Sequence, residues 1–375
     1  MSAATTEQTQ PESDRAHMRA ALALARRGLG TVWPNPAVGC VIVKDRRVVG
    51  RGWTQPGGRP HAETEALAMA GRDAAGATVY VTLEPCAHHG KTPPCAEALI
   101  SAGVIRVVVA VEDPDSRVAG KGLDTLRRAG IVVTTGVLET EAADLNAGFF
   151  QRVTVGRPLV TLKLASTLDG RIATHSGESR WITGDVARTA AHLLRAETDV
   201  IMVGSGTALH DNPDLTCRLP GLMERSPVRV VVDGRLRLPL TSRLVASASE
   251  NPTWVLTLEG GDPARREAFE DAGVDIVEVA PGPDGAIDLS LGLEALAESG
   301  VTRVLVEGGA HLAAALLRAD LVDRLVWFRA PALMGGDGLA AAVSFGIDHL
   351  AQMPRFQRID VHPVGGDIME TYSRL

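Results

Sequence analysis

The stretch His61-Ala62-Glu63, followed downstream by Pro85-Cys86 and then by Cys95, decides how the first part of this chain folds. It supplies an imidazole, a nearby carboxylate and two thiols. A catalytic zinc ion takes three protein ligands and keeps its fourth position for water, and His61, Cys86 and Cys95 are ligands of the right kind. Zinc lowers the pKa of such a water towards neutrality, and Glu63 is close enough in sequence to move its proton. The pattern therefore predicts a zinc site with its own acid/base.

The elements expected around this stretch present the ligands at their ends. Pro60 suits a helix start, so a helix is predicted from His61 to about Ala70. A strand is predicted from Thr78 to Leu83 and another helix opens at Cys95, where the helix dipole and free N–H groups favour a thiolate. Strands and helices continue to alternate along the chain, which indicates an α/β layer fold with a largely parallel sheet.

Length and composition indicate two globular domains. The chain has 375 residues, of which 45% are hydrophobic and 22% charged, and this length suits two domains. Residues 1–12 are polar and unpatterned, so a disordered tail is expected there. Gly156-Arg157-Pro158 is the expected boundary between a first domain over 13–156 and a second over 157–375.

Charge and cysteine usage limit the function classes. The formal net charge of −7 argues against nucleic-acid binding, which requires a basic face. We expect no membrane segment, because no apolar run is long enough to cross a bilayer. The four cysteines, Cys40, Cys86, Cys95 and Cys217, are expected to be reduced thiols of a cytoplasmic protein. A homo-oligomer, dimer or tetramer, is expected.

The C-terminal half carries a second group of polar motifs. Glu307-Gly308-Gly309 follows an expected strand and precedes an expected helix, an arrangement that lets the backbone approach an anion. No Gly-x-Gly-x-x-Gly follows the first strand of this half, so a Rossmann domain is not supported. Arg195 and Arg218 flank a polar loop and could clamp a phosphate. Each feature alone is more often ordinary structure, and only their combination supports a nucleotide-binding hypothesis.

The zinc pattern resembles the cytidine-deaminase superfamily, in which His-x-Glu is followed by Pro-Cys and a second cysteine. Here eight residues, instead of the usual two, separate Cys86 from Cys95. That spacing, together with Asn35-Pro36-x-Val38-Gly39, resembles the deaminase half of the bacterial bifunctional riboflavin-biosynthesis enzymes over roughly residues 14–150. The resemblance implies a three-layer cytidine-deaminase-like domain, with Glu63 as the catalytic proton carrier. It also implies that Asn35 binds the pyrimidine and that His88 and Lys91 line the substrate pocket.

The second half resembles the reductase half of the same family over about residues 157–375, which implies a dihydrofolate-reductase-like α/β domain that uses NADPH. The motifs that carry the resemblance are Lys163-x-Ala165-x-Thr167-x-Asp169-Gly170, Ser179-x-Trp181-Ile182-Thr183, Arg195, residues 207–218 and Glu307-Gly308-Gly309. The residues implied to contact NADP are Ala165, Trp181, Thr207, Asp211, Gly309, Ala310, His311 and Leu312. Those implied to contact the substrate are Ser179, Arg195, Leu215, Arg218 and Glu307, with the two arginines near its phosphate.

The resemblance implies two consecutive steps of riboflavin synthesis, with one zinc ion per chain and NADPH as cofactors. Zinc-bound hydroxide would deaminate a diamino-phosphoribosylaminopyrimidine while Glu63 protonates the leaving amine. NADPH would then reduce the phosphoribosylaminouracil to its ribitylamino phosphate.

Three alternatives remain open from the residues themselves. The first is a deaminase of another base or nucleoside, with a C-terminal domain that binds a nucleotide without reducing anything. The second is a nucleic-acid-editing deaminase, which the negative charge disfavours. The third is a non-catalytic protein with a structural zinc site, closed by His88 or His89 as fourth ligand.

Overall fold

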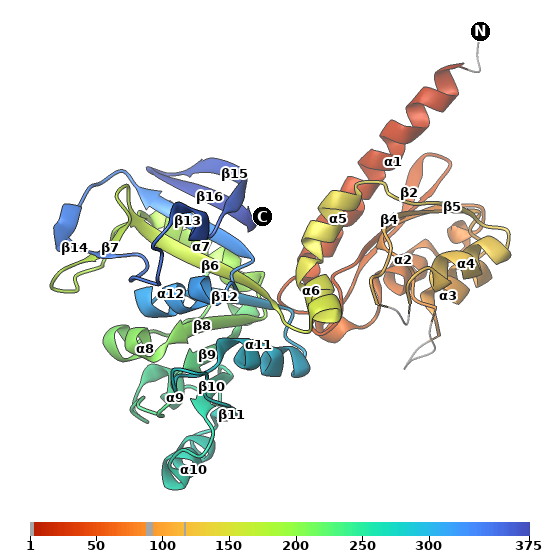
Figure 1. Cartoon of the computed structure of the whole chain (residues 1–375). Helices are drawn as coiled ribbons and strands as arrows, with labels where there is room; N and C mark the ends of the chain where they lie inside the picture. The colour runs from red at the N-terminus through yellow and green to blue at the C-terminus, as the bar shows by residue number, and fades with distance from the viewer. Residues whose placement is uncertain (1–3, 88–92, 116–117) are drawn as a thin grey trace. The chain divides into compact units, whose positions relative to one another are not determined.

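The structure is a computed structural model that describes residues 4–87, 93–115 and 118–375, with backbone only for 4–11 (Figure 1). Contacts divide the chain into two compact units, Met1–Gly156 and Arg157–Leu375. Among the described residues, none of the helices combines the length and apolar character needed to cross a membrane.

The first unit contains a five-stranded sheet in the order β2-β1-β3-β4-β5. The strands are β1 (Gly39–Lys44), β2 (Arg47–Trp53), β3 (Thr78–Leu83), β4 (Arg106–Val111) and β5 (Val132–Thr134). Strand β1 pairs antiparallel with β2 and β3, whereas β3, β4 and β5 are parallel. The sheet is therefore mixed, and only one half of it is parallel as expected.

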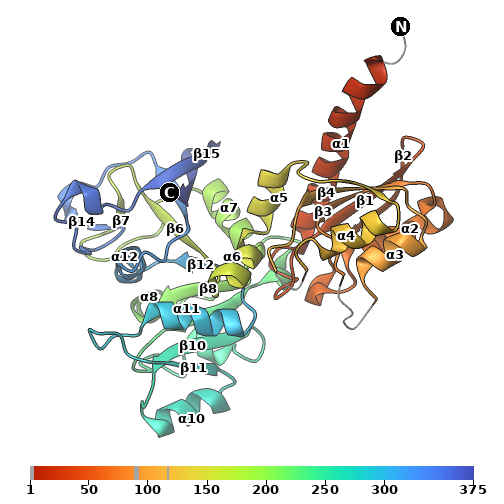
Figure 2. The same cartoon turned by 45° about the vertical axis from the view of Figure 1, so that its right-hand side comes forward.

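Helices cover both faces of this sheet and make the three layers that were expected (Figure 2). They are α1 (Ala4–Ala25), α2 (Ala62–Ala70), α3 (Cys95–Ser101), α4 (Lys121–Arg128), α5 (Glu139–Leu145) and α6 (Ala147–Val155). Short 3-10 turns lie at Arg26–Gly28, Pro56–Gly58 and Gly71–Ala74. Helices α1 and α5 lie on one face, and α2, α3 and α4 on the other.

Helix α1 corrects one expectation. It begins at Ala4, so the disordered tail expected over residues 1–12 is not what the structure has from residue 4 onwards. The later part of α1 is anchored, because Met18 and Ala21 are buried in the core of the first unit. Extending an anchored helix adds a hydrogen bond for each residue fixed and avoids the cost of a new nucleus. The polar composition of the segment did not reveal that anchor.

Glycines allow α2 to pack directly on the sheet. A Cβ placed on Gly52 would overlap the Ala62 carbonyl oxygen and lie 2.7 Å from the Ala66 nitrogen. Such an approach is possible only for a residue without a side chain. The contact fixes the start of α2, and therefore His61 just before it, relative to strand β2.

The second unit contains a nine-stranded sheet in the order β11-β10-β9-β8-β12-β6-β13-β16-β15. Its strands are β6 (Leu159–Thr167), β8 (Val200–Gly204), β9 (Val228–Val232), β10 (Thr253–Leu258), β11 (Asp275–Val279), β12 (Arg303–Glu307), β13 (Arg324–Ala330), β15 (Phe356–Val364) and β16 (Asp367–Arg374). The strands from β11 to β13 are parallel, and β16 and β15 continue antiparallel. A separate pair joins β7 (Arg171–Thr174) to β14 (Gly338–Ala340).

The helices of this unit connect and cover the parallel strands. They are α7 (Asp185–Ala196), α8 (Ser205–Asp211), α9 (Arg243–Ala246), α10 (Pro263–Asp271), α11 (Leu289–Glu298) and α12 (Ala310–Arg318), with 3-10 turns at Met223–Arg225, Gly335–Asp337 and Leu350–Gln352. Strand β12 lies between β8 and β6. The carboxyl ends of neighbouring parallel strands meet at one edge of a sheet, which is where α/β folds place their ligands.

Candidate functional site

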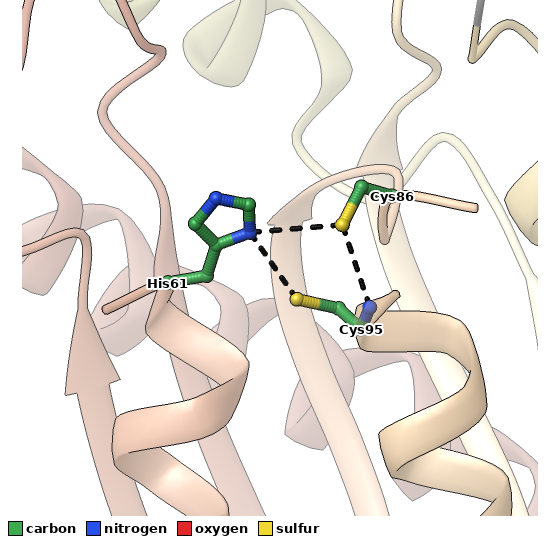
Figure 3. A group of neighbouring side chains, drawn as sticks. All are labelled: His61, Cys86 and Cys95. Atoms are coloured by element: carbon green, nitrogen blue, oxygen red, sulfur yellow. Dashed lines mark hydrogen bonds between the residues drawn. The ribbon is translucent and has the colours of Figure 1, made fainter. Parts of the chain in front are cut away.

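The fold of the first unit brings the three predicted metal ligands together (Figure 3). His61 directly precedes α2, Cys86 follows β3 in the turn Glu84-Pro85-Cys86, and Cys95 is the first residue of α3. His61 Nδ1 faces both sulfurs, at 3.3 Å from Cys95 Sγ and 3.6 Å from Cys86 Sγ. The three ligand atoms lie within 4.8 Å of one another.

These distances fit a tetrahedral zinc ion. Zn–S bonds of about 2.3 Å and Zn–N bonds of about 2.0–2.1 Å place neighbouring ligand atoms roughly 3.5–3.8 Å apart. The backbone N–H of Cys95 donates to Cys86 Sγ at 3.4 Å, a contact that stabilises a thiolate. One imidazole and two sulfurs form a donor set that suits zinc. The residues present therefore fit the expected metal, and the described part of the chain supplies three ligands for it.

Electrostatics at the site also favour a thiolate. The hydrogen bond from Cys95, followed by that from His61, lowers the pKa of Cys86 to about 4. The same hydrogen bond with Cys86 raises the pKa of Cys95, because one proton is held between the two sulfurs. A metal ion that displaces this proton takes over the charge that the site already stabilises.

Glu63 has the properties of a proton carrier. It lies in the first turn of α2 and only 4% of its surface is exposed. Burial, followed by the negative charge of Cys86, raises the pKa of Glu63 to about 7. A carboxyl group with a pKa near the working pH can both accept and donate a proton.

The remaining residues expected in this pocket are only partly described. A Cβ on Gly58 would overlap the Asn35 side-chain amide, so Asn35 packs on the loop that leads into His61. His88 and Lys91, and with them the alternative fourth ligand His89, lie outside the described residues. Their predicted roles stay predictions.

A cavity of about 520 Å³ in the second unit lies where β6, β8 and β12 come together. Predicted NADP contacts in its wall are Ala165, Trp181, Thr207, Asp211, Gly309, His311 and Leu312. Predicted substrate contacts in its wall are Ser179 and Glu307. The cavity thus gathers most of the residues that the motifs suggested, from segments far apart in the sequence.

Four predicted contacts are absent from the described lining: Ala310, Arg195, Leu215 and Arg218. Ala310 is the first residue of α12, between two lining residues. Leu215 is buried with a positive φ of 56°. Arg218 is exposed, and its backbone N–H donates to His192 Nδ1 at 3.3 Å.

Arg195 is engaged with the protein itself. Its Nε and Nη2 donate to the two carboxylate oxygens of Glu307 at 2.7 and 3.0 Å, and its Nη1 donates to the Thr216 carbonyl at 2.8 Å. This two-point pairing is the strong form of an arginine–carboxylate contact. Arg195 therefore fixes Glu307 at the cavity wall, a role that the motif pattern did not reveal.

Lys163 is a residue whose role the sequence reasoning did not assign. Its Nζ lies 3.7 Å from Glu307 Oε2 and 5.7 Å from the ring centre of Phe328, and it lines the cavity. Burial alone would raise the pKa of Glu307, but the charges of Arg195 and Lys163 lower it to about 2. A lysine in the middle of the largely buried strand β6 was an available signal, because a lysine that is mostly shielded from solvent is rarely without a partner.

The glycine turn after β12 borders the same cavity. Gly308 and Gly309 have φ of 95° and 86°, conformations that other residues rarely adopt. A Cβ on Gly309 would lie 3.0 Å from Thr207 Oγ1. The turn thus permits close approach of backbone from β12 to the start of α8.

Comparisons with known proteins agree with both halves of this description. Residues 11–111 match the family model of the cytidine and deoxycytidylate deaminase zinc-binding region, and residues 158–369 match that of the RibD C-terminal domain. The riboflavin biosynthesis protein RibD of Escherichia coli K12 is 44% identical over 95% of this chain and 98% of its own length.

Solved structures agree as well. Acinetobacter baumannii RibD (form 1) superposes with a TM-score of 0.87 at 42% identity, covering 98% of this chain and 100% of that one. A Thermotoga maritima diaminohydroxyphosphoribosylaminopyrimidine deaminase/5-amino-6-(5-phosphoribosylamino)uracil reductase gives 0.84 at 36% identity, with 97% and 99% covered. The expected fold, a cytidine-deaminase-like domain followed by a dihydrofolate-reductase-like domain, is confirmed. The chain belongs to the RibD family of riboflavin-biosynthesis proteins, which join a zinc-binding deaminase domain to a reductase domain.

Proposed function

We propose that this chain catalyses two consecutive steps of riboflavin biosynthesis on one phosphorylated pyrimidine. The first unit removes an amino group from 2,5-diamino-6-(5-phosphoribosylamino)pyrimidin-4(3H)-one. The second unit reduces the resulting 5-amino-6-(5-phosphoribosylamino)uracil to its ribitylamino phosphate. The observation that carries the proposal is the buried Glu63 beside a ligand set of His61, Cys86 and Cys95.

In the deaminase unit, His61, Cys86 and Cys95 hold the metal and Glu63 moves the proton. Zinc, when bound there, supplies a Lewis acid that lowers the pKa of water. Glu63 accepts a proton as the water oxygen bonds to the amine-bearing ring carbon, and donates a proton to the leaving nitrogen. The C–N bond then breaks and ammonia leaves. Burial, which raises the pKa of the Glu63 carboxyl, favours a group that holds a proton between the two transfers.

In the reductase unit, the cavity at the ends of β6, β8 and β12 takes both NADPH and the substrate. NADPH supplies the hydride, which the family passes to ribose C1′ as the ring opens. Lys163 and Glu307 present a fixed ion pair to this cavity, and the Lys163 ammonium can donate a hydrogen bond to a substrate oxygen. Arg195 holds Glu307, so the exposed Arg218 is the arginine proposed for the phosphate.

The test follows the two products separately in one reaction. Ammonia release and loss of NADPH absorbance are recorded with the diamino substrate, for the wild-type protein and for Glu63→Gln. We expect ammonia to precede NADPH loss, and the variant to lower ammonia release by about 100- to 10,000-fold. Supplying the deaminated substrate should restore NADPH loss in the variant.

Other results would point elsewhere. Ammonia release without NADPH consumption would favour a deaminase with a non-reducing second domain. A zinc-loaded wild-type protein that releases no ammonia would refute the deaminase assignment.

The cofactors, compartment and assembly are part of the proposal. We propose one zinc ion per chain and NADPH, which elemental analysis and cofactor titration test. A cytoplasmic location suits the free thiols Cys86 and Cys95, since an oxidising compartment would compete with the metal for them. The expected dimer or tetramer stays a prediction that light scattering tests.

A further inference from the structure

Glu84 is a buried carboxylate in the turn that presents the metal ligand Cys86. It directly follows β3, and only 4% of its surface is exposed. It lies outside the ligand set and outside the proton pathway proposed above. A buried carboxylate requires partners that satisfy both oxygens.

The partners of Glu84 that the described residues supply here are backbone N–H groups. Oε1 accepts from Gly122 at 2.8 Å and from Leu123 at 3.3 Å. Oε2 accepts from Gly120 at 3.0 Å and from Asp113 at 3.3 Å. The carboxylate therefore joins the turn after β3 to the loop after β4 and to the first turn of α4.

Helix α4 depends on this contact for its N-terminal cap. Its own N-cap residue is Gly120, which has no side chain to cap the helix. Glu84 satisfies first-turn N–H groups that would otherwise lack acceptors, and its charge faces the positive end of the helix dipole. Gly122 permits the approach, because a Cβ there would overlap the Pro85 carbonyl oxygen and lie 3.1 Å from Glu84 Oε1.

The metal-ligand turn is thus held on two sides. On the α3 side, the Cys86 carbonyl accepts from the Ala96 N–H at 3.2 Å, and Cys86 Sγ accepts from the Cys95 N–H at 3.4 Å. On the α4 side, Glu84 supplies the hydrogen bonds described above. If the Glu84 side chain is lost, the turn keeps its contacts with α3 and the hydrogen bond from the Glu84 N–H to the Val111 carbonyl at 3.0 Å, but it loses its tie to α4.

We propose that Glu84 is a positioning residue for the metal centre, which sets where Cys86 presents its sulfur by clamping the Glu84-Pro85-Cys86 turn to the N-terminus of α4. The proposal rests on the proposed zinc site and on the proposed deamination. Two properties should then depend on Glu84: how firmly the site retains zinc, and how well ordered the first turn of α4 is.

The experiment compares Glu84→Ala and Glu84→Gln with wild type in the full-length chain. Glutamine keeps the shape of the side chain and one acceptor oxygen. Its NH2 group replaces the other oxygen and faces backbone N–H donors, with which it cannot pair. Zinc release to an excess of chelator is timed in the loaded proteins, and hydrogen–deuterium exchange of the 118–128 amides is measured in the metal-free proteins. The control is Asp124→Asn, which removes an exposed charge from the same helix turn.

We expect Glu84→Ala to release zinc about 10- to 100-fold faster than wild type, as is usual when a partner behind a metal ligand is lost. The zinc-release rate of Glu84→Gln should lie between those of wild type and Glu84→Ala. In both variants the 118–128 amides should exchange faster without metal, and deaminase kcat should fall more than KM changes. Asp124→Asn should match wild type. NADPH oxidation with deaminated substrate should be unchanged in all three variants, which shows that the second unit is folded.

The outcomes separate this proposal from the function itself. If both Glu84 variants release zinc and exchange their 118–128 amides at the wild-type rates, the proposal is overturned. If Glu84→Ala does not fold, the role of Glu84 is decided by comparing the zinc release and amide exchange of Glu84→Gln with those of Asp124→Asn. A wild-type protein that binds zinc but releases no ammonia would refute the deaminase function, while the zinc-release and exchange results would still decide the role of Glu84.

Discussion

The buried side chain of Asn146 allows a prediction that can be worked through from geometry. Its Nδ2 donates to the Ala37 carbonyl at 3.0 Å, and its Oδ1 accepts from the Ala37 N–H at 2.9 Å. Asn146 thereby joins the junction of α5 and α6 to the turn that carries Asn35. Only 3% of its surface is exposed, so water does not readily replace it.

Replacing Asn146 with alanine would leave the backbone N–H and C=O of Ala37 without these partners. Each buried polar group left unsatisfied costs roughly 1–3 kcal/mol, so the loss of both partners should destabilise the first unit by about 2–6 kcal/mol. Asn146→Asp keeps an acceptor for the Ala37 N–H but places a carboxylate oxygen against the Ala37 carbonyl. It should also destabilise, since it loses the donor and adds a buried charge.

The loss should also be visible in catalysis. If Asn35 contacts the pyrimidine, as the family resemblance implies, loosening its turn should raise the deaminase KM more than it lowers kcat. The stability change is measured by denaturant unfolding, and hydrogen exchange of the β1 and α1 amides shows where the structure loosens. Deaminase kinetics are measured at a temperature where the variant is folded. Asn146→Ala with a stability change below about 0.5 kcal/mol would refute the reasoning, because that is the range of a neutral surface substitution.

Three further predictions concern charge, packing and metal. Glu307 has a pKa lowered from 4.5 to about 2 by Arg195 and Lys163 despite its burial, so its contribution to stability should be full above about pH 4.5 and lost as the pH falls towards 2. Acid unfolding of the second unit, followed by exchange of the β12 amides, should show this loss, and an identical acid profile in Glu307→Gln would contradict it. Gly52→Ala should destabilise the first unit by about 1–3 kcal/mol and weaken zinc retention, because the new methyl group overlaps the Ala62 carbonyl oxygen; calorimetry and chelator titration check this, and a fully stable variant would be inconsistent with the close packing. Removing the metal with a chelator should abolish ammonia release and lower the melting temperature of the first unit, while NADPH oxidation with deaminated substrate continues; a parallel loss of both activities would show that the second unit also depends on the metal.

Much of the site could be predicted because its residues lie in short sequence segments with recognisable patterns. The ligand set His61, Cys86 and Cys95 needs particular side chains at the ends of short elements, and element ends are marked by proline, glycine and a change of hydrophobic period. The same holds for the glycine turn Gly308-Gly309 after β12. The alternation of strands and helices likewise predicted α/β layers, although it did not predict that β1 would pair antiparallel with β3.

The partners of polar side chains could not be predicted in this way, since they come from segments distant in sequence. Arg195 was predicted to lie near the substrate phosphate, but its pairing with Glu307 was not predicted, and neither was the pairing of Asn146 with Ala37. Helix α1 reaches back to Ala4 because packing of its later residues supports it.

The sequence by itself determined which residues are predicted to hold the metal and carry its proton, since zinc accepts few donor types and the spacing of His61, Glu63, Cys86 and Cys95 is short-range information. Only the tertiary structure decided which groups hold those residues in place. Glu84 caps a helix that starts well downstream of it, and no local pattern encodes that contact. A buried polar group is shielded from bulk water and therefore needs a hydrogen-bond partner inside the protein. The packing of the layers decides which group that partner is.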